Sequence, residues 1–488
     1  MKKAFSNELY VELQSKHIQE RIQQFDNKLY LEFGGKLFDD HHASRVLPGF
    51  EPDSKLKMLL TLKDKVEVII AVCAKDLERH KVRGDLGISY DDEVFRLIDE
   101  YKRVGLYVGS ITITQYQHQN AADTFKNKLE NRGMRVFIQY PIEGYPHDVN
   151  HIISKEGFGK NDYIETTKPL IVVTAPGPGS GKMSTCLSQL YHEHLHGIHA
   201  GYAKFETFPI WNLPLKHPVN LAYEAATIDL NDVNMIDPFH LDKYHVTTVN
   251  YNRDIEIFPV LNAMFNKIFG ESPYASPTDM GVNMAGYAII DDEAAKDASC
   301  REIVRRYYHA QVDYLMGKIN TKSLEKMKTL LSQANVDAQN RKCAIYAHQV
   351  AKKNQTSSCA IELNDGHLIG GKTSSLLRAS SASLLNALKY LAHIDQEVEL
   401  ISPALLESIL SLKNDYLNIK NPLLDIDEVL LTLAIASASD PNAKKCLEVM
   451  PLLKDCEIHS TTILSKKDNE TLRHLQMNLT CDPKTGNT

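Results

Sequence analysis

A glycine-rich loop, residues 175–182 (APGPGSGK), has the residue types and spacing that most clearly predict chemistry. It follows the apolar run 169–175 and precedes a helical pattern. Glycines let backbone N–H groups surround an anion, a helix N-terminus adds partial positive charge, and a lysine can reach phosphate oxygens. The loop therefore predicts a phosphate or nucleotide site. Its candidate ligands are Gly177, Gly179, Ser180, Gly181, Lys182 and Ser184.

The same loop departs from the P-loop pattern G-x-x-x-x-G-K-[ST] at two positions. Pro176 replaces the first glycine, and Met183 replaces the hydroxyl residue that would hold Mg²⁺. Ser184 follows directly, but one residue step along a helix turns a side chain by about 100°, so Ser184 cannot simply take over that role. We expect ATP, another nucleotide or a simpler phosphate compound to bind here. The sequence leaves open whether Mg²⁺ takes part and whether hydrolysis occurs.

Charged residues elsewhere in the sequence are candidates to complete this site. Basic side chains suit an anion, and arginine can donate to two phosphate oxygens at once. The basic candidates are Lys36, Arg45 and Arg253. Residues 201–240 are predicted to form a long binding loop, because long structured loops in compact domains are often functional. Acidic residues of this loop could position a metal or act as a general base. With Lys182, the candidate catalytic residues are Asp229, Asp232 and Asp237.

A second motif, His192-Glu193-His194-Leu195-His196, matches H-E-x-x-H. On a helix, His192 and His196 share one face and could bind zinc, with Glu193 as general base. However, the helix that carries the motif begins at the glycine-rich loop. Its far end lies away from the carboxyl ends of the strands, where ligands bind in parallel sheets. Zinc-dependent hydrolysis is therefore the less favoured alternative, and no residue is assigned as a metal ligand.

Strand and helix patterns alternate through the first half of the chain. Runs rich in β-branched residues predict buried strands at 66–74, 106–114, 135–142 and 169–175, with helices between them. This alternation predicts an α/β fold with a mostly parallel, doubly wound sheet that contains a P-loop-like strand–loop–helix. The predicted domains are an α/β domain at 1–250, a helical domain at 251–335 and a C-terminal α/β domain at 336–488.

The composition excludes several classes of protein. The 488 residues contain 55 Lys+Arg and 62 Asp+Glu, a net charge of −7 that argues against binding to nucleic acid or an anionic membrane. No run approaches the roughly 20 apolar residues of a membrane span, and the N-terminus lacks the apolar core of a signal peptide. The 8 cysteines form no C-x-x-C pair and are expected to be reduced thiols. We predict a cytoplasmic protein with a small phosphate-containing partner, and the sequence leaves open whether it forms a homo-oligomer.

Long segments of the sequence resemble a known bacterial family. The segments include KLYLEFGGKLFDDHHASRVLPGF, APGPGSGK, KFETFPIWNLPLKHPVNLAYEAA, DVNMIDPFH, TVNYNRDIEIFPVL, SPTDMGVNMAG and GKTSSLLRASSASLLNALK. The family is named domain of unknown function 1846, also uncharacterised protein family 0371, and the resemblance covers essentially the whole chain. It implies a cytoplasmic bacterial protein with an N-terminal α/β part, a helical part and a C-terminal α/β part. It implies no activity.

Three functional hypotheses therefore remain. The first is a protein that binds phosphate or a nucleotide at the glycine-rich loop, which could be an enzyme of the phosphotransferase or ligase type. The second is a non-enzymatic interaction or assembly protein in which the loop is only a tight turn. The third is the zinc-dependent hydrolase. Whether the chain is an enzyme at all stays open at this stage.

Overall fold

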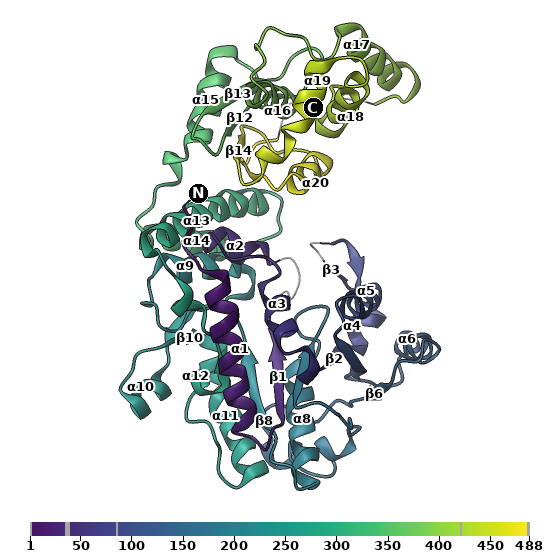
Figure 1. The fold of residues 1–488 in the computed structure, drawn as a ribbon, viewed down its shortest axis with the longest axis vertical. Helices are drawn as coiled ribbons and strands as arrows, with labels where there is room; N and C mark the ends of the chain where they lie inside the picture. Colours follow the sequence, from purple (N-terminus) through teal and green to yellow (C-terminus); the bar gives the residue numbers. More distant parts are fainter. Residues whose placement is uncertain (1, 35–39, 84–85, 420–421, 486–488) are drawn as a thin grey trace. The chain divides into compact units, whose positions relative to one another are not determined.

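The protein, seen here in a computed structural model, folds into two compact units (Figure 1). The structure describes four stretches of the chain, which are residues 2–34, 40–83, 86–419 and 422–485. The N-terminal unit comprises Lys2–Glu224 and Asp232–Ser299, and the C-terminal unit comprises Ala225–Asn231 and Cys300–Thr488. Among the described helices, none combines the length and the apolar character needed to cross a bilayer.

A seven-stranded sheet forms the centre of the N-terminal unit, and all of its strand pairs are parallel. Its spatial order is β11 (Gly281–Val282), β8 (Gly201–Phe205), β1 (Leu29–Phe33), β7 (Leu170–Thr174), β2 (Val66–Cys73), β5 (Tyr107–Thr114) and β6 (Val136–Ile138). Every residue of β1, β2 and β7 is buried, as expected for the central strands of a sheet covered on both faces. The predicted parallel α/β fold is confirmed.

Helices and two short hairpins surround this sheet. The helices are α1 (Asn7–Gln23), α2 (His41–Val46), α3 (Ser54–Thr61), α4 (Ala74–Glu78), α5 (Tyr90–Arg103), α6 (Asn120–Glu130), α7 (Val149–Ile152), α8 (Lys182–Leu195), α9 (Pro218–Ala226), α10 (Pro238–Tyr244), α11 (Asn252–Phe269), α12 (Pro277–Met280) and the start of α13 (Asp292–Leu315). The hairpins pair β3 (Val82–Arg83) with β4 (Ile88–Ser89), and β9 (Asn234–Ile236) with β10 (Val249–Tyr251).

The direction of the connections places the glycine-rich loop at a special point of the sheet. From β1 the chain passes through α2 and α3 to β2, toward the edge of the sheet formed by β6. From β7 it passes through α8 to β8, toward the opposite edge formed by β11. Because such crossovers are right-handed, the two connections cover opposite faces of the sheet. The adjacent carboxyl ends of β1 and β7 therefore form a topological switch point, where ligands of doubly wound folds bind.

Residues 201–240 are not the long loop that the sequence predicts. They contain β8, α9, β9 and the start of α10, and β8 pairs with both β1 and β11 inside the main sheet. The sequence GYAKF has no strong strand signal, because it contains a glycine and a lysine. Its pairing with two neighbouring strands, which lie far away in the sequence, determines its conformation.

The C-terminal unit contains a mixed four-stranded sheet. The order is β13 (Leu368–Lys372), β12 (Ser358–Glu362), β14 (Glu457–Ser460) and β15 (Asn478–Cys481), with β14 and β15 parallel and the other pairs antiparallel. Its helices are the rest of α13, α14 (Thr321–Gln333), α15 (Lys342–Asn354), α16 (Ala379–Leu391), α17 (Pro403–Ser411), α18 (Ile426–Ala436), α19 (Pro441–Glu448) and α20 (Lys466–His474). β12 and β13 form a hairpin whose turn contains the sequence Asn-Asp-Gly at 364–366.

The two faces of this smaller sheet have different neighbours. A side chain added at Gly370 would meet Tyr346 and Val350 of α15, whereas one added at the next residue, Gly371, would meet the backbone of α16. Successive residues of a strand point to opposite faces, so α15 and α16 cover opposite faces of the sheet. Ile458 of β14 belongs to the apolar core that α16 completes. The residues next to it on β14, Glu457 and His459, are polar and lie on the face that α15 covers.

Candidate functional site

The glycine-rich loop connects β7 to α8 at the switch point, as the sequence predicts. Gly181 has φ +90° and precedes the first residue of α8. A Cβ atom at Gly181 would lie 2.9 Å from the side chain of Thr114, at the end of β5. Thr114 Oγ1 donates a hydrogen bond of 2.8 Å to the carbonyl oxygen of Ser180, and Ser180 Oγ donates to the carbonyl oxygen of Gly177 at 3.0 Å. The loop is thus held by bonds to its carbonyl groups.

The backbone N–H groups of the loop remain unused. Among the described residues, no acceptor meets the amides of Gly177, Gly179, Ser180, Gly181 and Lys182. The first amides of a helix have no partner within the helix, and here the preceding turn adds further donors. Unpaired amides next to a helix N-terminus attract anions.

Lys182 is the first residue of α8 and is partly exposed. Within the described part of the chain, its ammonium group forms no ion pair and no hydrogen bond. The hydroxyl of Ser184, by contrast, is engaged, because it donates to the carbonyl oxygen of Gly181 at 3.0 Å. Met183 has no hydroxyl. The loop therefore fits an anion, but Met183 stands directly after the lysine, where a P-loop has the hydroxyl that holds Mg²⁺.

A charged cluster lies at the carboxyl ends of β1 and β8, and its members are Glu32, Lys204, Glu206 and Asp254. Lys204 Nζ lies 2.6 and 2.7 Å from the two carboxylate oxygens of Asp254, and 3.1 Å from Glu206 Oε1. Glu32 is buried and accepts a hydrogen bond of 2.6 Å from Tyr202 Oη. Sequence reasoning did not identify Glu32 or Asp254 as site residues, because each stands alone within an otherwise ordinary strand or helix pattern.

The surroundings of Glu206 shift the pKa of its carboxyl group. Burial raises the pKa of Glu206 to about 7; Asp254 acts in the same direction, and Lys204 opposes the shift. Burial disfavours the charge of Lys204, but Asp254 and Glu206 together raise the pKa of its ammonium group above the ordinary value. Glu206 keeps 30% of its side chain exposed. A carboxyl group with a pKa near neutrality and access to solvent can both take up and release a proton, as a general acid–base group does.

Cys186 connects the charged cluster with the glycine-rich loop. This residue lies one turn after Lys182 on α8, and its thiol is fully buried. Burial raises the pKa of Cys186 well above its ordinary value, Glu32 raises it further, and Lys182 opposes the shift. The glycine-rich loop follows β7, and Glu32 and Lys204 lie near the carboxyl ends of the neighbouring parallel strands β1 and β8, so the loop and the charged cluster share one edge of the sheet.

Two further predicted residues, Asp232 and Arg253, form an ion pair beside this region. Arg253 Nε lies 2.6 Å from Asp232 Oδ1, and Arg253 Nη2 lies 2.8 Å from Asp232 Oδ2. Burial disfavours the charge of Arg253, but Asp232, and then Asp254 and Glu206, raise its pKa. Burial also raises the pKa of Asp232, against the effect of Arg253. The guanidinium group is thus already bound to a carboxylate, and a phosphate would have to compete with Asp232 for it.

Two of the remaining predicted residues, Asp237 and Arg45, lie in or at the start of helices of the N-terminal unit. Asp237 is buried at the start of α10, where its carboxylate accepts hydrogen bonds from Phe239 N, His240 N and Thr278 Oγ1. Arg45 is part of α2. Lys36 lies outside the described residues, so its role stays a prediction.

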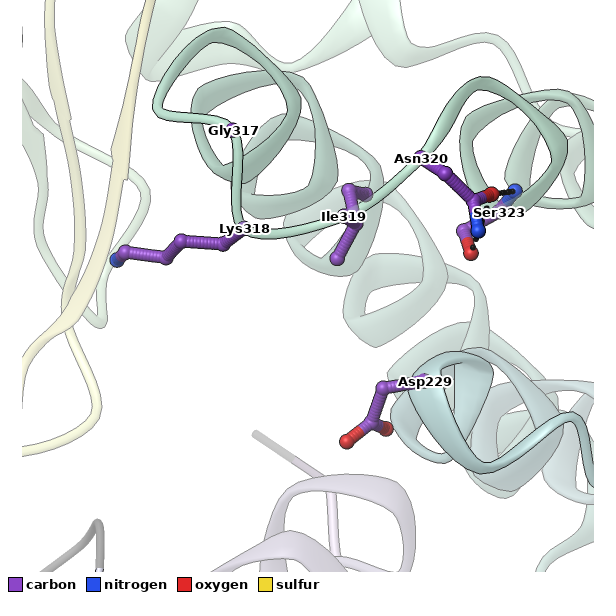
Figure 2. A pocket seen from close by; sticks show the side chains of 6 residues that line it. All are labelled: Asp229, Gly317, Lys318, Ile319, Asn320 and Ser323. Carbon is purple, nitrogen blue, oxygen red and sulfur yellow. Dashed lines mark hydrogen bonds between the residues drawn. The ribbon is translucent and has the colours of Figure 1, made fainter.

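Asp229 belongs to the C-terminal unit and not to the unit that carries the glycine-rich loop. It lines a pocket of about 320 Å³ with Gly317, Lys318, Ile319, Asn320 and Ser323 (Figure 2). Asn320 Oδ1 accepts a hydrogen bond from Ser323 N at 3.0 Å and so caps α14. Asp229 and Lys318 are the ionisable residues among the six that line this pocket.

The H-E-x-x-H motif lies at the end of α8, and its acid is occupied. Glu193 is fully buried and accepts a hydrogen bond of 2.6 Å from Tyr30 Oη, while Lys28 Nζ lies 2.8 Å from the same carboxylate. His196 stacks on Tyr163, with ring centroids 4.5 Å apart. A carboxylate held by a tyrosine and a lysine is a poor general base for a metal-bound water. The geometry therefore favours a structural role for Glu193.

Substitution of Gly181 should test the geometry of the loop. Gly179 and Gly181 both have positive φ, but a Cβ atom meets nothing within 4 Å at Gly179 and meets Thr114 at Gly181. Gly179→Ala should cost about 1–2 kcal/mol for the left-handed backbone, and Gly181→Ala should cost about 1–3 kcal/mol more because of overpacking. Urea unfolding followed by the fluorescence of Trp211, the single tryptophan, measures both. Equal losses in the two variants would contradict the described contact.

The pKa of Glu206 predicts a pH dependence of stability. Because this pKa rises from 4.5 to about 7 on folding, the folded chain binds the proton more tightly than the unfolded chain between these values. The contribution to stability is complete below about pH 4.5 and is lost as the pH rises through 7. Relative to Glu206→Gln, the wild type should therefore lose stability from pH 5 to pH 8. The loss should stay below about 1.4 kcal/mol per pH unit, because one proton is involved and solvent screens the exposed part of the group.

Urea unfolding of wild type and Glu206→Gln across this pH range measures the effect. The control is Glu143→Gln, which changes an exposed glutamate of the same unit. Glu143→Gln should follow the wild type at every pH. Parallel stability curves for wild type and Glu206→Gln would show that Glu206 does not titrate near neutrality.

Comparison with known proteins gives matches over nearly the whole chain. The N-terminal model of the family described as domain of unknown function DUF1846 matches residues 3–335, and the C-terminal model matches residues 339–488. A UPF0371 protein of Streptococcus thermophilus (strain CNRZ 1066) is 56% identical over 482 residues, which are 99% of this chain and 98% of the relative. A UPF0371 protein of Streptococcus pneumoniae (strain JJA) matches with the same identity and coverage. The resemblance seen in the sequence is confirmed, and these names state no activity.

Proposed function

Because the chain belongs to the DUF1846 family, whose name assigns no reaction, we propose a function from the site itself: the N-terminal unit binds a small phosphate-containing ligand at the glycine-rich loop. A nucleotide such as ATP is the ligand class that we propose first, because a glycine-rich loop between a strand and a helix at a switch point suits it. The proposed partner is this small ligand, and not nucleic acid or a membrane.

One observation carries the proposal. Among the described residues, the five backbone amides of the loop have no acceptor, and the ammonium group of Lys182 has no partner. Buried or partly buried donors of a folded protein are normally paired, so a set of unpaired donors at one place suggests a ligand that accepts from them. The N–H dipoles of these amides have their positive ends on the hydrogen atoms, and the charge of Lys182 is also positive. An anion with several oxygens, such as a phosphate group, matches this set.

The charged cluster supports a reaction next to the bound phosphate. Glu206 can take up a proton near neutral pH, and Lys204 stays protonated between Asp254 and Glu206. We therefore propose Glu206 as the acid–base group, with Lys204 and Asp254 as the residues that position it. Met183 replaces the hydroxyl residue that holds Mg²⁺ in a P-loop, so no step of the proposal depends on a metal ion at this loop. A reaction of the phosphotransferase or ligase type remains compatible with these groups.

Differential scanning calorimetry of the full chain with ATP, GTP, pyrophosphate or inorganic phosphate tests the proposal. A ligand at 100 times its dissociation constant should stabilise the unit that binds it by about 2.7 kcal/mol. Sodium chloride at matched ionic strength is the control for general salt effects. If none of the four ligands raises the unfolding temperature, the proposal fails, and a non-enzymatic role with a structural loop becomes the better explanation.

A further inference from the structure

Two histidines and an aspartate of the C-terminal unit meet on the α15 face of its sheet. His348 is on α15, His459 is on β14, and Asp482 follows β15. His348 Nε2 lies 2.9 Å from Asp482 Oδ2, and His459 Nε2 lies 3.3 Å from Asp482 Oδ1. Each side chain offers one potential ligand atom, a ring nitrogen or a carboxylate oxygen, and these three atoms lie within 4.8 Å of one another. We call these residues the imidazole–carboxylate cluster.

The position of His459 leaves one of its ring nitrogens unsatisfied. The side chain is fully buried, and Nε2 makes no hydrogen bond although Asp482 Oδ1 is near. Nδ1 lies 2.9 Å from Thr480 Oγ1. The hydroxyl of Thr480 accepts a hydrogen bond from Arg341 Nε at 2.9 Å and donates one to the carbonyl oxygen of Ile458 at 3.4 Å. These bonds favour a proton on Nδ1, which leaves a lone pair on Nε2 facing a carboxylate.

A lone pair and a carboxylate oxygen repel each other unless a proton or a metal cation lies between them. Two imidazole nitrogens with one carboxylate are the ligands that zinc and other first-row divalent metals prefer. Ligands of tetrahedral zinc lie about 3.4 Å apart, close to the 3.3 Å between His459 Nε2 and Asp482 Oδ1. A metal-binding histidine also normally donates its other N–H to an acceptor, the role that Thr480 can fill for His459.

Access and surrounding charge are compatible with such an ion. The side chain of His348 is 51% exposed, so the cluster opens to solvent on that side. Arg341 is neutralised by Glu457, whose Oε2 lies 2.7 Å from Arg341 Nη1. Lys484 Nζ is 3.9 Å from Asp482 Oδ2, on a largely exposed side chain that is free to turn away. We propose that His348, His459 and Asp482 bind one divalent transition-metal ion of the zinc class.

The test uses the full chain after treatment with a chelator and dialysis. Competition titration with Zn²⁺ alone, together with elemental analysis, should give about one tightly bound ion per chain. His348→Ala removes an exposed ligand without opening the core, and it should weaken Zn²⁺ binding at least about tenfold, since one of three protein ligands is lost. Asp482→Asn should have an effect of similar size. The matched control His474→Ala removes an exposed histidine of the same unit and should leave binding unchanged.

A second measurement separates this cluster from other histidines. Co²⁺ bound by the wild type should give visible absorption bands, and His348→Ala should change them. Far-ultraviolet circular dichroism of the variant is the control: an unchanged spectrum shows that the change in the bands does not come from loss of folding. His196→Ala, in the N-terminal unit, should leave these bands intact. Equal Zn²⁺ affinity of wild type and His348→Ala would overturn the proposal. The proposal would also be overturned if His196→Ala lost the metal while His348→Ala kept it.

Discussion

Glu457→Gln is expected to destabilise the C-terminal unit by about 3 kcal/mol or more, the cost of leaving a buried charge without its partner. Glu457 forms ion pairs with Arg305 and Arg341, and all three side chains are almost fully buried. Burial opposes the charge of Glu457, but the two arginines hold its pKa below the ordinary value. Arg305 keeps Glu302 at 2.7 Å after the substitution, which places the expected cost toward the lower end of the usual 3–5 kcal/mol.

Hydrogen exchange followed by mass spectrometry measures this loss in the right place, because peptides of β12 and β14 report on the C-terminal unit alone. A change of about 3 kcal/mol should speed their exchange more than a hundredfold, since each 1.4 kcal/mol is a factor of ten. Glu325→Gln is the control, because Glu325 forms only an exposed ion pair with Lys328 and such pairs contribute about 0–1 kcal/mol. If both variants exchange alike, the buried ion pairs do not stabilise the unit.

The elements that sequence reasoning predicted well are those with strong local signals. The expected strand at 66–74 is β2 (Val66–Cys73), and the expected strand at 169–175 is β7 (Leu170–Thr174). Both are short, mostly apolar runs rich in β-branched residues, the pattern expected of a strand buried on two faces. α5 (Tyr90–Arg103) is one of the helices expected between the strands, and the side chain of Ser89 accepts a hydrogen bond from Asp92 N at its start.

The elements that were missed depend on partners far away in the sequence. β8 and β11 are short, and their sequences contain glycine or charged residues. β8 forms because β1 offers a complete row of hydrogen-bonding groups and because Asp254 and Glu206 compensate the charge of Lys204. Neither fact can be read from residues 201–205 alone.

The same distinction applies to the candidate site. The glycine-rich loop could be predicted, because its glycines, its lysine and its place between a strand and a helix are consecutive in the sequence. Glu32 and Asp254 come together with Lys204 only after the sheet forms, so no spacing in the sequence marks them. Asp237 shows the opposite case: its position suggested chemistry, yet its carboxylate caps α10. Acidic residues before a helix often have this simpler role.

Lys182→Ala is expected to weaken the binding of ATP or pyrophosphate by about 10–100-fold. A hydrogen bond to a charged group contributes about 1.5–3 kcal/mol, and removal of the ammonium group deprives the phosphate of such a bond. The backbone amides of the loop remain, so we expect residual binding and not complete loss. Because Lys182 has no partner within the described chain, the substitution breaks no contact of the fold and should leave the unfolding temperature without ligand nearly unchanged.

Isothermal titration calorimetry with pyrophosphate measures the effect without contributions from a nucleotide base. Lys155→Ala removes an exposed lysine of the same unit and changes the net charge equally, so it separates a local contact from the general field of the protein. Lys182→Arg keeps the charge and should recover most of the affinity. If Lys182→Ala binds pyrophosphate as tightly as the wild type, the phosphate does not lie at the start of α8. If Lys155→Ala loses as much affinity as Lys182→Ala, the attraction comes from net charge, and the unpaired amides of the loop have no ligand.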